Sequence, residues 1–235
     1  NVPTEKLYKL ASRRINEMSG VADIYDEEAN LLRQVDNMAI EIQHYKIQEK
    51  IGIGGMATVY RAWDEQNARF VAIKILNNNF ASNPQMIKRF KREAEIMSSL
   101  QHPNIVQCFD TGEAKRLFYI VMEYIDGINL SQFLEKQGKL DFNVVIHIIN
   151  PIIEALNSVH IKGFFRNDIK PGNILFSSIG KVYLTDFGIT KSYQGDMEVT
   201  GPILPIGTPH YISPEEWQNN PANVCSDVYS LGVTM

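Results

Sequence analysis

The stretch Asp168-Ile-Lys-Pro-Gly-Asn173, followed downstream by Asp186-Phe-Gly188, decides how this chain is interpreted. It supplies two carboxylates, an amide and, at Lys170, an ammonium group. Metal-assisted phosphoryl transfer needs hard oxygen ligands for Mg²⁺, a carboxylate that positions the acceptor hydroxyl group, and a cation near the transferred group. Each of these residues is ordinary in a surface loop, but the ordered set is specific. The stretch therefore indicates this chemistry.

A glycine-rich stretch, Ile51-Gly-Ile-Gly-Gly-Met-Ala-Thr-Val59, lies between two predicted strands. Phosphate oxygens need close backbone N–H groups, and glycine lets the chain turn and approach without a Cβ in the way. A hairpin turn is the plain alternative for such a cluster. The stretch is not a Walker A loop, because no Gly-Lys-Ser/Thr follows. It also leads into a strand rather than a helix, which argues against a dinucleotide-binding fold.

A lysine ends the β-rich run Val71-Ala-Ile-Lys74. Burying an ammonium group is costly unless the group is paired. One interpretation is an edge-strand lysine that reaches solvent. The other is a cation held over anionic phosphates by a carboxylate from the next predicted helix, where Glu93 is a suitable partner. Together with the glycine-rich stretch, the second interpretation is favoured.

The hydrophobic pattern predicts an α+β chain, with a small β-rich half followed by a larger helical half. The predicted strands of the first half are 45–51, 58–62, 70–75, 105–110 and 117–123, with a helix at 84–100. The second half is predicted to contain helices at 131–136 and 142–161 and short strands at 174–176 and 182–184. Residues 1–43 are predicted to be a helical segment, either a linker or packing helix or a regulatory or dimerising element.

Composition narrows the class of protein. The chain has 235 residues, is 44% hydrophobic and 21% charged, and has a net charge of −4, so no general basic surface indicates nucleic-acid binding. Its two cysteines, Cys108 and Cys225, are far apart, which fits a reducing, cytoplasmic setting. No membrane span or signal peptide is predicted in this segment. The first residue is Asn1, so we expect an excerpt of a longer protein, in which a membrane anchor elsewhere stays open.

Taken together, these motifs resemble those of eukaryotic-type protein kinases. The stretches Gly52–Tyr60 (GIGGMATVY) and Ser226–Val233 (SDVYSLGV) are most similar to the bacterial Ser/Thr members. The resemblance covers about residues 45–235. It implies a two-lobe fold with an ATP-binding N-lobe at 44–125 and a partial C-lobe at 126–235. It also implies an ATP- and Mg²⁺-dependent enzyme of bacterial signalling that transfers the γ-phosphate to Ser/Thr hydroxyls of proteins.

The resemblance assigns a role to each residue of the nucleotide site. Met122 takes the gatekeeper position, the backbone of Glu123 and Ile125 reads the adenine edge, and Asn129 reaches the ribose. The adenine ring is held between Val59, Ala72 and Leu175. The complete implied ATP-binding set is Ile51, Gly52, Ile53, Gly54, Gly55, Met56, Ala57, Thr58, Val59, Ala72, Lys74, Met122, Glu123, Ile125, Asn129 and Leu175, in which Ala57 stands where the family has its third glycine.

The resemblance likewise assigns the catalytic residues. Lys74 contacts the α- and β-phosphates and pairs with Glu93. Asp168 accepts the proton of the substrate hydroxyl group or orients that group, and Lys170 stabilises the transferred phosphoryl group. The Mg²⁺ ligands are Asn173 and Asp186.

Two further features imply a Ser/Thr rather than a Tyr specificity. They are Lys170, placed two residues after Asp168, and Gly207-Thr208 ahead of Ser213-Pro-Glu215. Thr208 is expected to bridge Asp168 and Lys170. In the activation segment, Thr200 is expected to be a phosphorylated site, with an exposed loop hydroxyl as the alternative. The implied partners are protein substrates and a second copy of the chain during autophosphorylation.

The sequence departs from the family at two places. Arg166-Asn167 replaces the usual His-Arg, so position 167 has no charge for an activation-segment phosphate, and Arg166 must swing out or find an anion. The chain also stops at Met235, so Leu231 is expected to lose its cover and Glu215 its cationic partner. These departures keep a second hypothesis open, a nucleotide-binding pseudokinase that acts as a scaffold or allosteric partner. A small-molecule kinase is disfavoured by the peptide-docking motifs around Thr208.

Overall fold

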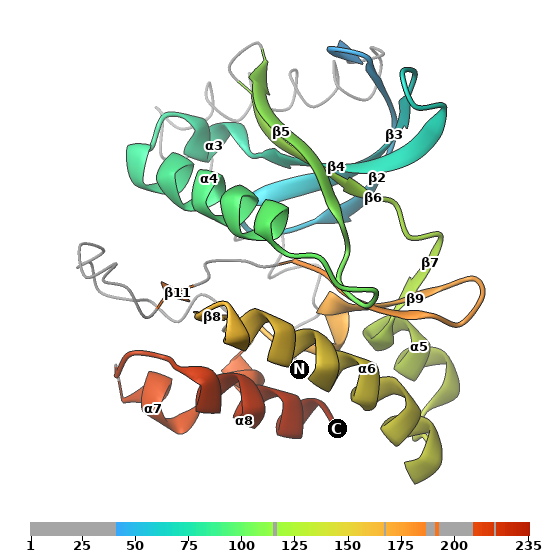
Figure 1. The fold of residues 1–235 in the computed structure, drawn as a ribbon, viewed down its shortest axis with the longest axis vertical. Helices are drawn as coiled ribbons and strands as arrows, with labels where there is room; N and C mark the ends of the chain where they lie inside the picture. The colour runs from blue at the N-terminus through green and yellow to red at the C-terminus, as the bar shows by residue number, and fades with distance from the viewer. Residues whose placement is uncertain (1–40, 115–116, 167, 187–190, 193–208, 219) are drawn as a thin grey trace, which may run out of the picture.

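The computed structural model describes residues 41–114, 117–166, 168–186, 191–192, 209–218 and 220–235, which form two lobes (Figure 1). The smaller lobe contains an antiparallel sheet in the order β1-β2-β3-β4-β6-β5. Two helices, α3 (Asn78–Ala81) and α4 (Pro84–Ser99), complete this lobe. The six strands are β1 (Glu41–Ile42), β2 (Tyr45–Ile53), β3 (Ala57–Asp64), β4 (Arg69–Leu76), β5 (Cys108–Ala114) and β6 (Leu117–Glu123).

Strand β4 is buried on both faces of the sheet. Its side chains point alternately to the two faces, and each face packs into a separate hydrophobic core. Val71 and Ile73 contribute to the outer core, whereas Ala72 and Leu76 belong to the core that faces α4 and the larger lobe. Because side chains alternate along a strand, Lys74 shares the second face with Ala72 and Leu76. The lysine is therefore directed inward, toward the junction of the lobes.

Helix α4 begins where the sequence predicts it. The Asn83 side chain accepts hydrogen bonds from the backbone N–H groups of Gln85 and Met86, and Pro84 occupies the first helical turn. The buried stripe of the helix includes Phe90, Ala94 and Met97, and also Glu93. A carboxylate within an apolar stripe needs a partner, and Lys74 supplies it.

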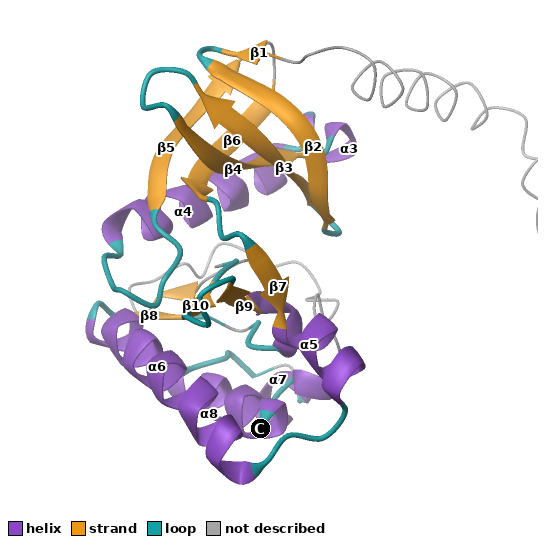
Figure 2. Cartoon of the chain, turned by 90° about the vertical axis from the view of Figure 1, so that its right-hand side faces the viewer, coloured by secondary structure: helices purple, strands orange, loops and turns teal. Residues whose placement is uncertain are grey.

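The larger lobe is mostly helical, with short strands at its upper surface (Figure 2). A three-stranded sheet has the order β10-β9-β7, and β8 pairs with β11. The elements are β7 (Gly127–Asn129), α5 (Leu130–Gln137), α6 (Phe142–Ile161), β8 (Phe164–Phe165), β9 (Ile174–Ser177), β10 (Val182–Leu184), β11 (Lys191–Ser192), α7 (Pro214–Trp217) and α8 (Val224–Thr234), with 3₁₀ turns at Pro171–Asn173 and Pro209–Tyr211. The predicted α+β class with two lobes is confirmed.

Helix α6 is the central helix of the larger lobe. By length and composition alone it could cross a membrane. However, one face of the helix is buried against β8 and β10, and this face includes Ile149, Ile152, Leu156 and Val159. The buried share of the most apolar window of this helix is 33%, so the buried face accounts for part of its hydropathy.

The two lobes are joined by hydrogen bonds as well as by the chain. Val106 N–H donates to the Leu184 carbonyl at 3.0 Å, and Leu184 N–H donates to the Asn104 carbonyl at 2.7 Å. The Asn104 side chain donates to the Val182 carbonyl at 2.8 Å. The strand predicted at 105–110 is therefore wrong at its start, because these residues bond to β10 and β5 begins only at Cys108.

The predicted helical segment 1–43 is wrong at its end; residues 1–40 lie outside the described part of the chain. Glu41–Ile42 form strand β1, paired with β2. Gln43 adopts a left-handed conformation with φ of 55° in the turn that follows. This turn buries Ile42 beside Tyr45 in the outer core, which a helix would not achieve.

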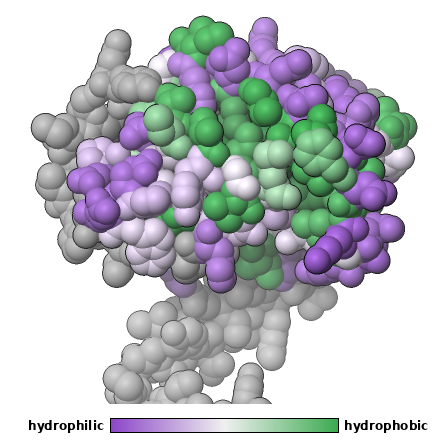
Figure 3. Space-filling view, turned by 90° about the horizontal axis from the view of Figure 1, so that it is seen from below, coloured by the Kyte–Doolittle hydropathy of each residue, from purple (hydrophilic) through white to green (hydrophobic). Residues whose placement is uncertain are grey.

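Seen from below, apolar side chains gather on the larger lobe (Figure 3). Helix α8 has exposed apolar residues in Val228, Tyr229 and Val233, whereas Leu231 is buried. The expectation that Leu231 loses its cover is therefore wrong. Glu215 accepts a hydrogen bond from Ser226 Oγ at 2.5 Å, and this bond lowers the pKa of its carboxyl group. The donor is a neutral hydroxyl group, so the expected loss of a cationic partner stays a prediction.

Gly127→Ala is expected to destabilise the protein by about 1–3 kcal/mol through overpacking. A Cβ at Gly127 would lie 1.7 Å from the Phe176 carbonyl oxygen, so β7 and β9 would have to separate. The matched control is Gly232→Ala, because Gly232 lies in helix α8 and a Cβ added there would meet open space. Urea denaturation of both variants measures the effect; equal stabilities would contradict the expectation.

Candidate active site

Lys74 forms ion pairs with two carboxylates at the junction of the lobes. Its Nζ lies 2.7 Å from Glu93 Oε1 and also contacts Asp186 Oδ1. Burial alone would lower the pKa of Lys74, but Glu93 and Asp186 together raise it above the ordinary value. The interpretation of Lys74 as a solvent-reaching edge lysine is therefore wrong, and the pairing with Glu93 is present.

Glu93 and Asp186 respond differently to this lysine. Burial raises the pKa of Glu93, whose side chain is 1% exposed, and Lys74 opposes the increase. For Asp186 burial acts in the same direction, but Lys74 outweighs it and the pKa is lowered. The Asp186 side chain is 43% exposed. Asp186 is thus the carboxylate that is open to a ligand, and Lys74 favours its ionised form.

The catalytic-loop residues are held together by Asp168. Its Oδ2 accepts hydrogen bonds from Lys170 Nζ and from Asn173 Nδ2, each at 2.9 Å. Asn173 Nδ2 also donates to the Asp168 carbonyl at 2.9 Å. Asp168, Lys170 and Asn173 therefore form one hydrogen-bonded group on the loop that contains the 3₁₀ turn.

Asn173 and Asp186 are brought together by the backbone. Thr185 N–H donates to the Asn173 carbonyl at 3.0 Å, which places the adjoining Asp186 beside the catalytic loop. Both hydrogen bonds from the Asn173 amide use its nitrogen, so they leave the oxygen for a cation. A carboxylate and an amide oxygen fit Mg²⁺, which takes few protein ligands when phosphates complete its shell.

The glycine-rich loop connects β2 to β3 above these residues. Gly52 pairs with Val59, and Val59 pairs with Lys74 on the next strand. Gly54 N–H donates to the Ala57 carbonyl at 2.8 Å, and a Cβ at Gly54 would lie 3.1 Å from that same oxygen. Gly55 has open space around it. Gly54 is thus the tightest position of this turn, where a Cβ would require the Ala57 carbonyl to shift slightly.

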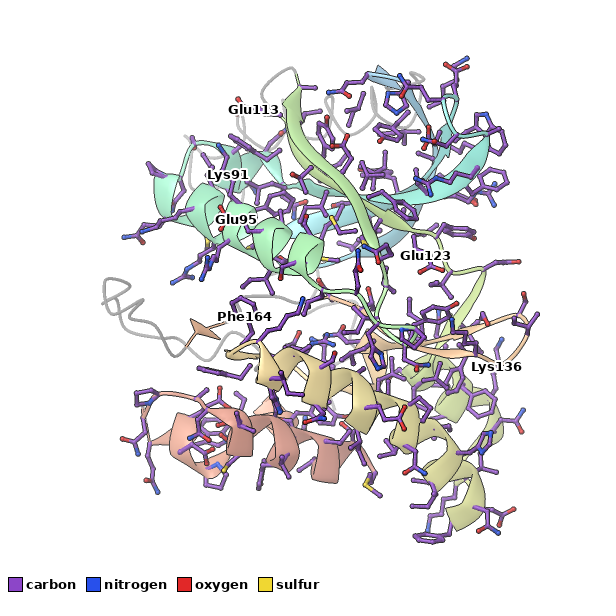
Figure 4. All side chains as sticks on the ribbon, in the orientation of Figure 1. Lys91, Glu95, Glu113, Glu123, Lys136 and Phe164 are labelled. Atoms are coloured by element: carbon purple, nitrogen blue, oxygen red, sulfur yellow. The ribbon has the colours of Figure 1, made fainter. Side chains whose placement is uncertain are left out.

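The residues expected to hold the adenine ring belong to one apolar cluster. Ala72 pairs with Met122 across β4 and β6, and both are buried in the core that also contacts Val59 and Leu175. Glu123, labelled in Figure 4, ends β6 where the chain leaves the smaller lobe. Its N–H donates to the Gln107 carbonyl at 2.8 Å.

Asn129 is engaged in a local role. Its side chain accepts a hydrogen bond from Gln132 N–H at 2.9 Å, and the Asn129 N–H donates to Gln132 Oε1 at 3.0 Å. This capping box begins helix α5. The remaining predicted residues of the glycine-rich stretch are in place on β2, β3 and their loop, whereas Asn167, Thr200 and Thr208 lie outside the described residues.

Arg166 is a site residue whose role sequence reasoning did not assign. It is fully buried, and its Nη2 donates to the carbonyl oxygens of Thr185 and Asp186. Its backbone N–H donates to Asp227 Oδ2 at 2.8 Å. The sequence signal that could have pointed to this role is the arginine at the position where the family has a histidine. Arg166 does not swing out; it bonds to backbone carbonyls.

Known proteins match the chain over the same region. The protein kinase domain family matches residues 45–235. The chain belongs to the protein kinase family. This kinase domain is 40% identical over 191 residues to the serine/threonine-protein kinase PrkC of Bacillus subtilis (strain 168), covering 81% of this chain and 29% of PrkC. It is 39% identical over 194 residues to the serine/threonine-protein kinase PknA of Mycobacterium tuberculosis, covering 80% of this chain and 45% of PknA.

A solved structure gives the same result. The crystal structure of the M. tuberculosis PknI kinase domain matches with a TM-score of 0.67 and 27% identity, over 83% of this chain and 72% of that one. The kinase domain spans less than half the length of the two curated relatives. The expected resemblance to bacterial Ser/Thr kinases is confirmed, and the names of these relatives favour an enzyme over a pseudokinase.

Proposed function

We propose that this kinase domain transfers the γ-phosphoryl group of ATP to Ser or Thr hydroxyls of proteins, with Mg²⁺ as cofactor. The observation that carries the proposal is the convergence on Asp186. Its carboxylate contacts Lys74, and the residue before it bonds to Asn173, which in turn bonds to Asp168. Cationic, metal-binding and hydroxyl-positioning groups therefore meet within one connected site.

Each residue would perform one task. Lys74, oriented by Glu93, would bind the α- and β-phosphates, and the glycine-rich loop would cover them with backbone N–H groups. Asp168 would orient the acceptor hydroxyl group and take its proton. Lys170, 2.9 Å from Asp168, would stabilise charge on the phosphoryl group in transit. A Mg²⁺ held by Asn173 and Asp186 would neutralise the phosphate charge.

The remaining assignments belong to the same proposal. Adenine would lie between Val59, Ala72 and Leu175, beside Met122. Thr200 would be an autophosphorylation site that needs a second copy of the chain, and Thr208 would bridge Asp168 and Lys170. The setting would be cytoplasmic, as part of a bacterial signalling protein with protein substrates.

A transfer assay tests the proposal. The protein is incubated with γ-labelled ATP, Mg²⁺ and a generic basic protein, and the label is expected on phosphoserine and phosphothreonine. Chelation of the metal is expected to abolish the transfer. Equal labelling by wild type and Asp168→Asn would contradict the proposal; nucleotide binding without any transfer would favour the pseudokinase.

A further inference from the structure

Arg166 lies directly behind the proposed metal-binding carboxylate. Its guanidinium group is fully buried, and Nη2 donates to both the Thr185 and the Asp186 carbonyl oxygens. One nitrogen thus spans the two peptide groups on either side of the Asp186 backbone. Hydrogen bonds from a charged donor are stronger than neutral ones.

Four carboxylates act electrostatically on this buried cation. They come from the catalytic loop, from the segment after β10, from α8 and from α4: Asp168, Asp186, Asp227 and Glu93. Burial lowers the pKa of Arg166, and these four groups oppose the change. An arginine side chain stays protonated in proteins, so the group acts as a fixed positive charge.

The backbone at Asp186 needs support. Its φ is 64°, in the left-handed region that non-glycine residues seldom adopt. Such conformations persist where the surroundings hold them. The carbonyls on both sides of this strained residue are the ones that Arg166 binds, and the Asp186 carboxylate consequently projects toward Lys74.

We propose that Arg166 is a positioning residue that holds the Asp186 backbone so that its carboxylate is oriented for metal-linked nucleotide binding. This inference rests on the proposed function, because it takes Asp186 as the Mg²⁺ ligand. It assigns a task to the arginine that replaces the family's histidine: a charged donor whose Nη2 binds two carbonyls at once.

The test measures binding of a non-hydrolysable ATP analogue with and without Mg²⁺. In wild type, Mg²⁺ is expected to increase the affinity. In Arg166→Met, the gain in affinity that Mg²⁺ produces is expected to fall about tenfold or more, which is the usual effect of removing a residue that orients a metal ligand. The affinity for the analogue without Mg²⁺ is expected to stay within about twofold of wild type. An unchanged gain in a folded Arg166→Met variant overturns the inference.

Two further variants separate positioning from folding. Arg166→Lys keeps the charge and a nitrogen donor on a shorter side chain, and Arg166→His keeps a nitrogen donor on a ring. We expect both variants to recover part of the Mg²⁺-dependent gain in affinity, in proportion to the bonds they can make. If Arg166→Met does not fold, the test rests on Arg166→Lys and Arg166→His. A Mg²⁺-dependent gain in affinity equal to that of wild type in both variants overturns the inference. Failure of the proposed function is distinct, because it shows as absent transfer in wild type even when the Mg²⁺-dependent gain depends on Arg166.

Discussion

Asp168→Asn is expected to lower kcat for phosphoryl transfer by about 10²–10⁴-fold, the usual contribution of a positioned acid or base. Asparagine keeps an oxygen that can accept the hydrogen bonds from Lys170 and Asn173, so the loop should retain its structure. It cannot take up the proton of the acceptor hydroxyl group. Initial rates at saturating ATP, together with nucleotide affinity, measure the effect.

The control for this variant is Asp141→Asn. Asp141 is exposed, and its side chain makes no capping hydrogen bond at the start of α6. Its replacement makes the same change in charge in the same lobe and is expected to leave kcat unaltered. A wild-type rate for Asp168→Asn, or an equal loss in Asp141→Asn, would refute the role assigned to Asp168.

Lys74→Met is expected to abolish phosphate binding and to lower the free energy of unfolding by about 3–5 kcal/mol, the cost of leaving a buried charge without its partner. Glu93 is the residue left behind, because its side chain is 1% exposed, whereas Asp186 is 43% exposed and can turn to solvent. Additional replacement of Glu93 by leucine is expected to restore most of the stability, because the carboxylate that lost its partner is then removed.

The pH dependence of this variant has a definite sign. Burial raises the pKa of Glu93, and removing Lys74 removes the opposing influence. The folded state then binds a proton that the unfolded state releases, so stability falls as the pH rises through the folded pKa. Urea denaturation at mildly acidic and mildly alkaline pH checks this, with Lys88→Met on the exposed face of α4 as control. A larger stability loss at acidic pH would contradict the argument.

The sequence was informative where function depends on short motifs and regular periodicity. Helix α4 could be predicted because its apolar residues, among them Phe90, Ala94 and Met97, recur at helical spacing. The pair Lys74–Glu93 could be predicted because a lysine in a buried strand needs a carboxylate, and the following helix offers one in the expected order.

Other features depend on contacts between distant segments, which leave no periodic signal. Strand β1 forms because Ile42 packs in the outer core beside Tyr45. The beginning of β5 is displaced because Val106 bonds to Leu184 instead of to β6. The position of Arg166 depends on two carbonyl acceptors on another segment. The bonds of Val106 and Arg166 thus join segments that are far apart in sequence.

The hydrogen bonds that attach residues 104–106 to β10 also constrain how the two lobes can move. With the chain connection after Glu123, they give two fixed points, and two fixed points define an axis of rotation. Elements beside this axis, such as the start of β5 and the end of β6, would move little. The end of the sheet where β1 lies is at the top of Figure 2, farther from this axis, and would swing through a wider arc. A rotation would therefore displace the far end of the smaller lobe most and leave the junction beside Glu123 nearly in place.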